Sequence, residues 1–264
     1  MTEDEIILTH ILKCRSIDLA LNKPTLTSFQ QEQFEDFKCR RQAGEPLQYI
    51  LGTCNFMGLE LAVNPAVLVP RPETEQLVDA ALKCFKGGCA LDLGTGSGNI
   101  AIALAKFVPH CQIVSIDLSA QALEVARVNA RQYKLEDRIQ FIQGDILFEN
   151  IILSAVKNLR FDLVISNPPY IPTAQLCSLP RDVQQEPSMA LDGGTDGLNF
   201  YRNIIKYTPC LLRRGACLMM EFGDGQAEAL KKLVEEQGDF SDIEIIQDLA
   251  GRERVIKVIL NSKS

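Results

Sequence analysis

The chain lacks several side chains on which enzymes commonly depend. It has no tryptophan and only two histidines among 264 residues, and its nine cysteines are scattered without a Cys-x-x-Cys pair. An odd number of scattered cysteines is typical neither of a disulfide framework nor of a zinc site, and we expect no metal ion. The shortage of histidine also argues against a Ser-His or Cys-His nucleophile.

Long apolar runs and an excess of positive charge are missing as well. No apolar stretch approaches membrane-spanning length, and the acidic start Met1–Glu5 lacks the basic residues of a signal peptide. We therefore expect a cytoplasmic protein that binds no membrane, and we expect a monomer. The net charge of −7 argues against a sequence-independent grip on a nucleic-acid backbone, and we interpret the pair Arg40-Arg41 as solvated surface.

The first 45 residues differ from the rest in their pattern of apolar residues, which predicts helices alone. Apolar residues at helical spacing predict one helix over Glu5–Ala20, which Asn22-Lys23-Pro24 should end. Ser28 is the expected N-cap of a second helix that stops before Gly44. These helices are too small for a large core of their own, so the segment 1–45 should either dock a partner or act as a stabilising appendage.

Residues 46–70 predict a short β-hairpin linker. The expected strands are Phe56–Val63 and Ala66–Val69, with Asn64-Pro65 turning between them. A helix should follow from Pro72, because proline near the first helical position and acidic residues in the first turn favour a helix start.

From residue 71 to 264 strands and helices alternate. Such alternation predicts an α/β fold with a mostly parallel sheet covered on both faces. The last two strands are joined by too few residues for a crossover helix and should pair antiparallel. The expected strands are Cys89–Leu93, Ile113–Ile116, Ile139–Gln143, Leu163–Ser166, Ala216–Phe222, Ile243–Gln247 and Val255–Leu260. The expected helices after the first are Asn99–Phe107, Ser119–Tyr133, Leu198–Leu212 and Gln226–Gln237.

The segment Leu91–Asn99, with the sequence Leu-Asp-Leu-Gly-Thr-Gly-Ser-Gly-Asn, predicts a strand, a glycine loop and a helix start. Glycines let the backbone approach a ligand closely. The dinucleotide fingerprint G-x-G-x-x-G needs glycine at position 99, where Asn99 stands, and this argues against a nucleotide-linked dehydrogenase. The spacing, with Asp92 just ahead of it, suits a cofactor that has an amino-acid end and no pyrophosphate.

Polar side chains also stand at the ends of the next strands. Asp117 ends the second strand of the sheet, where its carboxylate can accept hydrogen bonds from both ribose hydroxyls of a nucleoside. Asp145 ends the third strand, where it or its neighbours can meet an adenine amino group. Strand-end aspartates taken singly are more often turn formers, but the series continues with Asn167 on the fourth strand.

Asn167-Pro168-Pro169-Tyr170 closes this fourth strand, because two successive prolines cannot continue a β-ladder. The Asn167 side-chain oxygen and the adjacent proline carbonyls are hydrogen-bond acceptors in a stiff frame. Such a loop is suited to hold an NH2 group. The alternative is a proline-terminated strand in which Asn167 is only a turn residue.

Together these motifs resemble the class I S-adenosylmethionine-dependent methyltransferases. More narrowly, the chain resembles the PrmC/HemK family, the N5-glutamine methyltransferases of peptide chain release factors. The narrower resemblance rests on Gly44–Gly52, Val69–Glu75, Glu186-Pro187, Ala190-Leu191 and Gly193-Gly194.

The resemblance implies a Rossmann-like catalytic domain over residues 71–264, with a seven-stranded sheet, mostly parallel with an antiparallel final strand. It also implies that the helical domain helps to dock the release factor, whose Gly-Gly-Gln loop provides the substrate glutamine. The glycine loop would wrap the methionine end of S-adenosylmethionine, Asp117 would take the ribose, and the Asp145 region would border the adenine. The expected cofactor-binding residues are Gly94, Thr95, Gly96, Ser97, Gly98, Asp117, Leu118, Asp145, Ile146 and Asn167.

A carboxamide nitrogen is a poor nucleophile, so such an enzyme must aim it at the methyl group. We expect the Asn167 side-chain oxygen and the Pro168 carbonyl to accept the two amide hydrogens and to favour the developing positive charge. Tyr170 either packs against the amide or shapes the wall. The expected catalytic residues are Asn167, Pro168 and Tyr170, and the expected substrate-binding residues are these three with Pro169, Arg71 and Glu73. Arg71, Glu73 and Glu186 have an alternative role as ion-pairing residues that fix the linker.

Two other functions are considered. An adenine-N6 nucleic-acid methyltransferase meets the same hydrogen-bonding problem at an exocyclic amine, but it must also extrude the base, and the chain has no clear basic stripe. A non-catalytic binding module of the same fold would tolerate a degenerate glycine loop or a replaced Asn167, and both motifs are intact.

Overall fold

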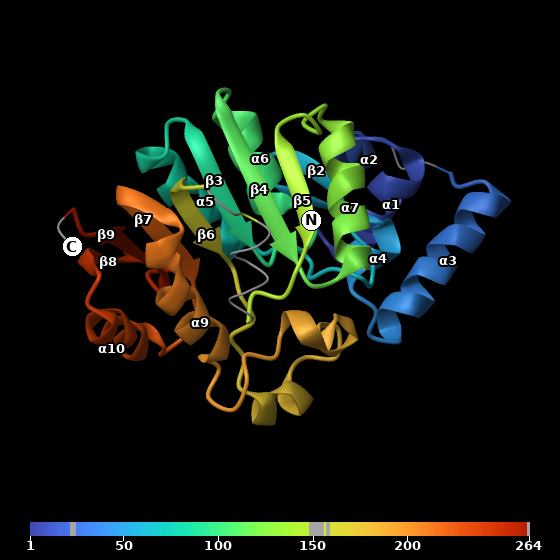
Figure 1. Ribbon diagram of the computed structural model, residues 1–264. Helices are drawn as coiled ribbons and strands as arrows, with labels where there is room; N and C mark the ends of the chain where they lie inside the picture. The colour runs from blue at the N-terminus through green and yellow to red at the C-terminus, as the bar shows by residue number, and fades with distance from the viewer. Residues whose placement is uncertain (22–24, 148–155, 157–158, 263–264) are drawn as a thin grey trace.

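The computed structural model describes residues 1–21, 25–147, 156 and 159–262. Within these residues, seven strands form one sheet in the order β5-β4-β3-β6-β7-β9-β8 (Figure 1). The strands from β5 to β7 are parallel, whereas β9 runs antiparallel to both of its neighbours, as predicted. The strands are β3 (Gly88–Leu93), β4 (Cys111–Asp117), β5 (Ile139–Gln143), β6 (Phe161–Ser166), β7 (Leu212–Glu221), β8 (Phe240–Gln247) and β9 (Glu253–Leu260).

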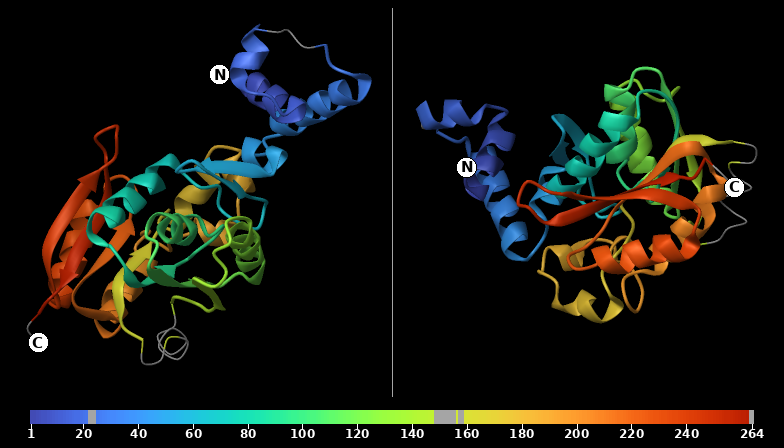
Figure 2. Two further views of the ribbon diagram at one scale, coloured as in Figure 1. Left: turned by 90° about the horizontal axis from the view of Figure 1, so that it is seen from above. Right: turned by 90° about the vertical axis from the view of Figure 1, so that its left-hand side faces the viewer.

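Helices cover both faces of the sheet, as the views in Figure 2 show. Alternate residues of β6 define the two cores: Leu163 and Ile165 pack with α5, α6 and α7, while Val164 packs with α9 and α10. This burial on both faces explains why the strands read as continuous apolar runs. The helices are α5 (Pro72–Cys84), α6 (Asn99–Phe107), α7 (Ala120–Gln132), α9 (Asn199–Tyr207) and α10 (Ala227–Gln237).

The order in which the chain adds strands to the sheet reverses between β3 and β6. The chain proceeds from β3 outward to β4 and β5, and then returns to place β6 on the other side of β3. The ends of the two strands are tied together, because Leu93 pairs with Ser166 and the Ser166 hydroxyl donates to the Leu93 carbonyl at 2.7 Å. Ligands of open α/β sheets bind at such a switch point, beyond the carboxyl ends of the strands.

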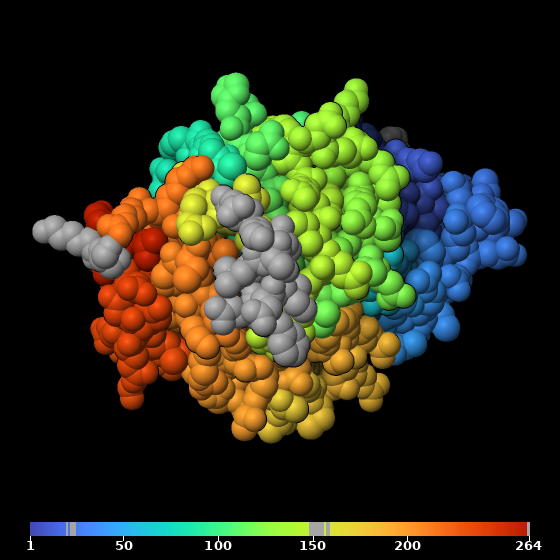
Figure 3. Space-filling view, viewed as in Figure 1, coloured from blue at the N-terminus to red at the C-terminus, as the bar shows by residue number. Residues whose placement is uncertain are grey.

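The segment between β6 and α9 lies beyond these carboxyl ends. It forms the gold and orange surface at the bottom of the space-filling view (Figure 3). Three short 3-10 turns shape it, namely η1 (Thr173–Ser178), η2 (Val183–Gln185) and η3 (Ser188–Ala190). The sequence analysis predicted no regular structure here, because turns this short carry no periodic signal.

The N-terminal helices differ from the prediction in two details. The prediction of a single helix over Glu5–Ala20 is wrong. The chain adopts a left-handed conformation at Lys13 (φ 50°), and the first helix ends there. The second N-cap is Thr27, not Ser28, since Thr27 and Gln30 form a reciprocal capping box. The expected terminator Asn22-Lys23-Pro24 lies outside the described residues. The helices are α1 (Glu3–Leu12), α2 (Ser16–Leu21) and α3 (Ser28–Gln42).

The linker forms a hairpin, but with another turn. The predicted strands Phe56–Val63 and Ala66–Val69, joined by Asn64-Pro65, are wrong. Met57-Gly58 makes the turn, with φ values of 50° and 75° that match the twist of a two-residue hairpin. Asn64 instead accepts a hydrogen bond from the Ala66 N–H at 2.9 Å, as in an Asx turn. The observed elements are α4 (Leu47–Leu51), which was not predicted, β1 (Thr53–Phe56) and β2 (Leu59–Ala62).

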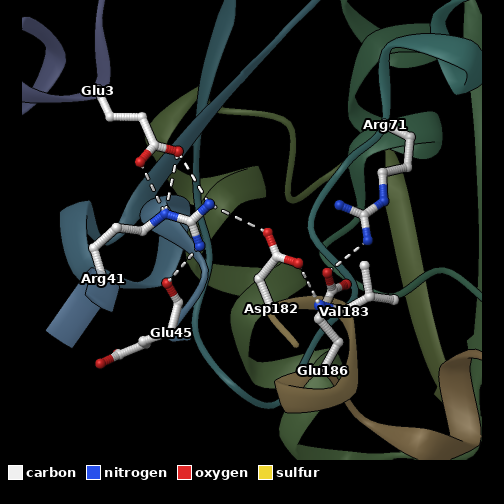
Figure 4. A network of polar contacts seen from close by, with 7 residues as sticks. All are labelled: Glu3, Arg41, Glu45, Arg71, Asp182, Val183 and Glu186. Carbon is white, nitrogen blue, oxygen red and sulfur yellow. Dashed lines mark hydrogen bonds and ion pairs between the residues drawn. The ribbon is translucent and has the colours of Figure 1, made fainter. Parts of the chain in front are cut away.

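Arg41 connects the N-terminal helices to the rest of the chain (Figure 4). Its guanidinium lies 3.0 Å from the Glu3 carboxylate on α1 and 3.4 Å from the Asp182 carboxylate beside η2. Asp182 in turn accepts a hydrogen bond from the Val183 N–H at 3.0 Å. The interpretation of Arg41 as solvated surface is therefore wrong, because a basic pair in sequence cannot show which acids the fold brings near it.

Candidate active site

Two cavities lie at the switch point. The first, of about 280 Å³, is called the glycine-loop cavity here. Most of the residues that the sequence analysis assigned to a cofactor come together on its wall, although they belong to loops after four different strands. They are Gly94, Gly96, Asp117, Leu118, Asp145, Ile146 and Asn167.

Glycine is required in the loop after β3 by its backbone conformation. Gly94, Gly96 and Gly98 have φ values of 77°, 54° and 82°, a region that residues with a side chain rarely adopt. Thr95 and Ser97 are buried, with exposed fractions of 2% and 1%, and neither they nor Gly98 line the glycine-loop cavity. These three residues therefore shape the loop without lining the cavity.

Asp92, on β3, supports the glycine loop through a hydrogen bond from Thr95. It is fully buried, and its Oδ2 accepts hydrogen bonds from the hydroxyls of Thr95 at 2.5 Å and Ser115 at 3.4 Å. Burial raises the pKa of the Asp92 carboxyl to about 7, while the Thr95 hydrogen bond acts in the opposite direction. Asp92 does not line the cavity, so its contact with a cofactor can only be indirect.

Asp117 joins the strand ends to the glycine loop. Its Oδ2 accepts from the Gly96 N–H at 2.8 Å and its Oδ1 from the Ser119 N–H at 2.9 Å. Each carboxylate oxygen has a further lone pair, which suits a pair of adjacent hydroxyls. Burial raises the pKa of the Asp117 carboxyl, and the backbone hydrogen bonds lower it. The Asp145 carboxylate is held similarly by the Leu147 N–H at 2.8 Å.

The second cavity, of about 360 Å³, is called the Tyr170 cavity here. It contains the expected substrate-binding residues, except that Pro169 lies on the wall of the glycine-loop cavity. Asn167 lines both cavities and thus stands where their contents would meet. The expected residues on the wall of the Tyr170 cavity are Arg71, Glu73, Asn167, Pro168 and Tyr170.

The amide of Asn167 has a defined orientation. Its Nδ2 donates to the Thr74 hydroxyl on α5 at 3.0 Å. Because the nitrogen is engaged with α5, the Oδ1 is the atom that can serve as an acceptor for a ligand.

The loop that carries Tyr170 is clamped by close backbone contacts. The Gln226 side chain donates to the Tyr170 carbonyl at 3.0 Å and accepts from the Gly223 N–H at 2.9 Å. A Cβ at Gly197 would lie 2.3 Å from the Tyr170 carbonyl oxygen, and one at Gly193 would lie 2.8 Å from its Cα. Burial raises the pKa of the Tyr170 phenol to about 12, so the ring stays neutral.

Arg71, Glu73 and Glu186 divide only in part between the two roles left open, because Arg71 has a place in both. Arg71 and Glu73 line the Tyr170 cavity, whereas Glu186 does not. Glu186 is 5% exposed and accepts from Arg71 at 2.5 Å (Figure 4). It also holds the linker, because it accepts from the Val69 N–H at 3.1 Å. Burial raises the pKa of Glu186, and the Arg71 charge beside it lowers that pKa.

Glu221, Thr74 and Arg254 were not predicted from the sequence as residues of the site. Glu221 lies within the strand that was predicted over Ala216–Phe222, and a single acid after an apolar run was the only signal for it. Arg254 is 9% exposed and pairs with Asp224 at 2.8 Å. Both Glu221 and Arg254 line the Tyr170 cavity.

Comparisons with known proteins agree with this geometry. Residues 2–52 match a family model described as the PrmC N-terminal domain, and residues 85–246 match one described as a methyltransferase domain. A release factor glutamine methyltransferase of Geobacter sulfurreducens is 46% identical over 219 residues, which cover 82% of this chain and 74% of that protein. Its counterpart in Thermodesulfovibrio yellowstonii is 38% identical over 99% of this chain and 93% of that protein.

The solved structures show the same fold. The crystal structure of a methyltransferase from Pyrococcus furiosus has a TM-score of 0.56 and 21% identity, and the similarity covers 89% of this chain and 98% of that one. The sheet order, the glycine loop and the match over almost the full length of curated relatives lead to one conclusion: this chain belongs to the release factor glutamine methyltransferase family.

Proposed function

We propose that this protein transfers a methyl group from S-adenosylmethionine to the side-chain amide nitrogen (N5) of the glutamine in the Gly-Gly-Gln loop of peptide chain release factors, and so modulates translation termination. The observation that carries this proposal is the position of Asn167 on the wall shared by the two cavities. One cavity then holds the methyl donor, and the other admits the glutamine.

The glycine-loop cavity fits S-adenosylmethionine. Gly94 and Gly96 leave open space where a side chain would stand, so that the backbone can approach the methionine end. The Asp117 carboxylate is fixed by two backbone N–H groups and retains lone pairs for the ribose hydroxyls. When bound, the cofactor supplies a sulfonium methyl group that is already a good electrophile.

The residues of the chain position the acceptor. We assign the Asn167 Oδ1 and the Pro168 carbonyl as acceptors for the two hydrogens of the substrate amide, which fixes the nitrogen at near-attack geometry. The same oxygens favour the positive charge that develops on the nitrogen. Tyr170 shapes the wall beside the amide. After transfer, the nitrogen is acidic enough to lose its proton to water.

Each segment of the chain has its own proposed role in bringing the release factor to the site. Residues 1–45 dock the release factor, residues 46–70 form the linker, and residues 71–264 carry out catalysis. No helix in the described part of the chain is long and apolar enough to cross a membrane. We propose that the enzyme works in the cytoplasm as a monomer and needs no direct contact with nucleic acid.

The decisive experiment is methylation of a purified release factor. Incubation with S-adenosylmethionine should add about 14 Da (one CH2) to its Gly-Gly-Gln peptide, as read by mass spectrometry. Duplex DNA incubated in parallel should gain no label from a labelled cofactor. Methylated adenine in the DNA with an unmodified release factor would instead favour the nucleic-acid methyltransferase, and absence of S-adenosylmethionine binding by calorimetry would favour a non-catalytic module.

A further inference from the structure

Glu221 is a buried acid beside the acceptor site. It is the last residue of β7 and is 1% exposed, and its side chain forms part of the wall of the Tyr170 cavity. The side chains of Thr74 and Asn167 lie within hydrogen-bonding reach of its carboxyl group. Within the described residues, its Oε2 has no hydrogen-bond partner. A buried carboxyl group with incomplete partners destabilises the fold, so its presence points to a role in the site.

The three polar side chains form a chain of hydrogen bonds with a direction. An ionised carboxylate only accepts, so the Thr74 hydroxyl donates its hydrogen to Glu221. The Thr74 oxygen then accepts from the Asn167 Nδ2, at 3.0 Å. If the Asn167 amide turned over, its Oδ1 would face two other acceptors and would be repelled. The direction of the chain therefore selects one of the two orientations of the amide.

We propose that Glu221 is a positioning residue for methyl transfer, which acts on the Asn167 amide both directly and through Thr74 to hold the Nδ2 toward α5 and the Oδ1 toward the substrate amide. This inference rests on the proposed function, since it concerns the acceptor role of Oδ1. The role assigned to Glu221, which is 1% exposed, is to orient the amide of Asn167.

The ionised form of Glu221 is the form that fixes this direction. A protonated carboxyl can donate to Thr74, which lets the Thr74 hydroxyl turn toward Asn167. Burial raises the pKa of Glu221 to about 7, hydrogen bonds from Thr74 and Asn167 lower it, the Arg254 charge also lowers it and the Glu73 charge raises it. The titratable and charged groups that face it are Glu73 on α5, Tyr170 after β6, Tyr201 on α9 and Arg254 on β9. We expect the methyl-transfer rate to rise with pH through about 7.

Three variants of the full chain test this inference. Glu221→Gln keeps the size of the side chain and removes its charge, Thr74→Val removes the hydroxyl at similar shape, and Thr74→Ser restores the hydroxyl. The readouts are single-turnover methylation of a release factor as a function of pH and the affinity for S-adenosylmethionine. Glu221→Gln and Thr74→Val should lower the rate roughly 10- to 100-fold with cofactor affinity unchanged, because the acceptor is misplaced. Thr74→Ser should stay near wild type, and Glu221→Gln should lose the rise with pH.

Wild-type rates in both Glu221→Gln and Thr74→Val would overturn the inference. Equal losses in Thr74→Ser and Thr74→Val would also overturn it, since they would indicate packing alone. The proposed function fails differently, because then the wild-type enzyme itself leaves the release factor unmethylated. In that event the side-chain amide signals of Asn167 in NMR spectra still decide: the inference requires them to shift in Thr74→Val and Glu221→Gln but not in Thr74→Ser.

Discussion

The two cavities meet at Asn167 but are built from different parts of the chain. The glycine-loop cavity depends on backbone, namely glycines with positive φ and the Asp117 carboxylate that backbone N–H groups hold. The Tyr170 cavity depends on charged side chains from α5, β7 and β9. The wall of the first cavity is therefore set largely by backbone conformation, and that of the second by side chains that substitution can change.

Each cavity nevertheless has one buried acid beside it. Asp92 lies under the glycine loop and Glu221 lies next to Asn167, and burial raises the pKa of both to about 7. Each accepts a hydrogen bond from a threonine hydroxyl, Thr95 in one case and Thr74 in the other. Both cavities thus have a buried carboxyl and a threonine hydroxyl beside them, and variants can separate the contributions of the two cavities.

Asn167→Ala should have the largest effect of these variants. It should affect the methyl-transfer step, which we assign to the Tyr170 cavity, and not the binding of the cofactor. Loss of the Oδ1 acceptor is expected to cost about 3 kcal/mol in the methyl-transfer step, as for the removal of one preorganised polar contact. Single-turnover kinetics should show this loss, while calorimetry should show S-adenosylmethionine binding largely intact. Equal losses of cofactor affinity and rate would contradict the separate contributions of the two cavities.

Asp117→Ala should show the reverse pattern. The variant removes two charged hydrogen bonds to the ribose hydroxyls, which contribute about 1.5 kcal/mol each, so the affinity for S-adenosylmethionine should fall roughly 150-fold. The rate at saturating cofactor should change much less. Asp117→Asn is the matched control, because it keeps the shape and one acceptor oxygen and should lose less affinity. A fall in the methyl-transfer rate with unchanged affinity for S-adenosylmethionine would show that Asp117 acts on the acceptor amide and not on the cofactor.

Gly197→Ala tests the clamp on Tyr170, and Gly225→Ala is its matched control. Both glycines have similar φ values, 76° and 78°, but only at Gly197 would a Cβ meet the Tyr170 carbonyl, at 2.3 Å. Overpacking of this kind costs about 2 kcal/mol in the free energy of unfolding beyond the backbone strain that both variants share. Urea denaturation should show this difference, and equal stabilities of the two variants would refute the clamp.

The two buried acids predict how stability depends on pH. Burial raises the pKa of Asp92 from 3.8 and that of Glu221 from 4.5, each to about 7, so the folded protein binds more protons than the unfolded chain between these values. Their contribution is fully present below pH 3.8 and is lost as pH rises through about 7. In Glu221→Gln the decline should be shallower by roughly 1 kcal/mol per pH unit, measured by urea denaturation across this range. A wild-type curve without a decline would contradict the two raised pKa values.

Arg41→Met should have the smallest effect. Ion pairs between partly exposed side chains, such as those of Arg41, contribute about 0.5 kcal/mol, so the free energy of unfolding should change little. If residues 1–45 dock the release factor, KM should rise roughly two- to threefold for the whole factor and not for a short Gly-Gly-Gln peptide. Arg40→Met is the control, since Arg40 pairs with Glu45 and not with the segment after β6. A KM that rises equally for factor and peptide would argue against docking through these helices.

Most of the fold could be predicted because local patterns in the sequence determine it. The alternation of apolar strands and helices, the glycines at 94, 96 and 98, and the short connection between β8 and β9 determine the parallel sheet and its antiparallel final strand. The hairpin turn was misplaced because Asn64-Pro65 is a stronger turn signal in sequence than Met57-Gly58. Only the pairing of β1 with β2 shows which turn is used.

The site could be predicted in part for the same reason. Residues at strand ends, such as Asp117 and Asn167, share one edge of any parallel sheet, so their approach follows from the order of elements. The partners of Asn167 could not be predicted, since Thr74 lies 93 residues earlier on α5 and Glu221 reads as an interior strand residue. Arg41 was misinterpreted because its ion pair with Asp182 joins segments 141 residues apart.

The pairing of β3 with β6 sets the distance between the starting points of two loops. Hydrogen-bonded strands lie about 4.8 Å apart, and the Ser166–Leu93 bond holds their ends in register. The glycine loop and the loop that begins at Asn167 therefore start one strand spacing apart. Side chains around Tyr170 can be replaced without altering this spacing, because the backbone of the sheet sets it.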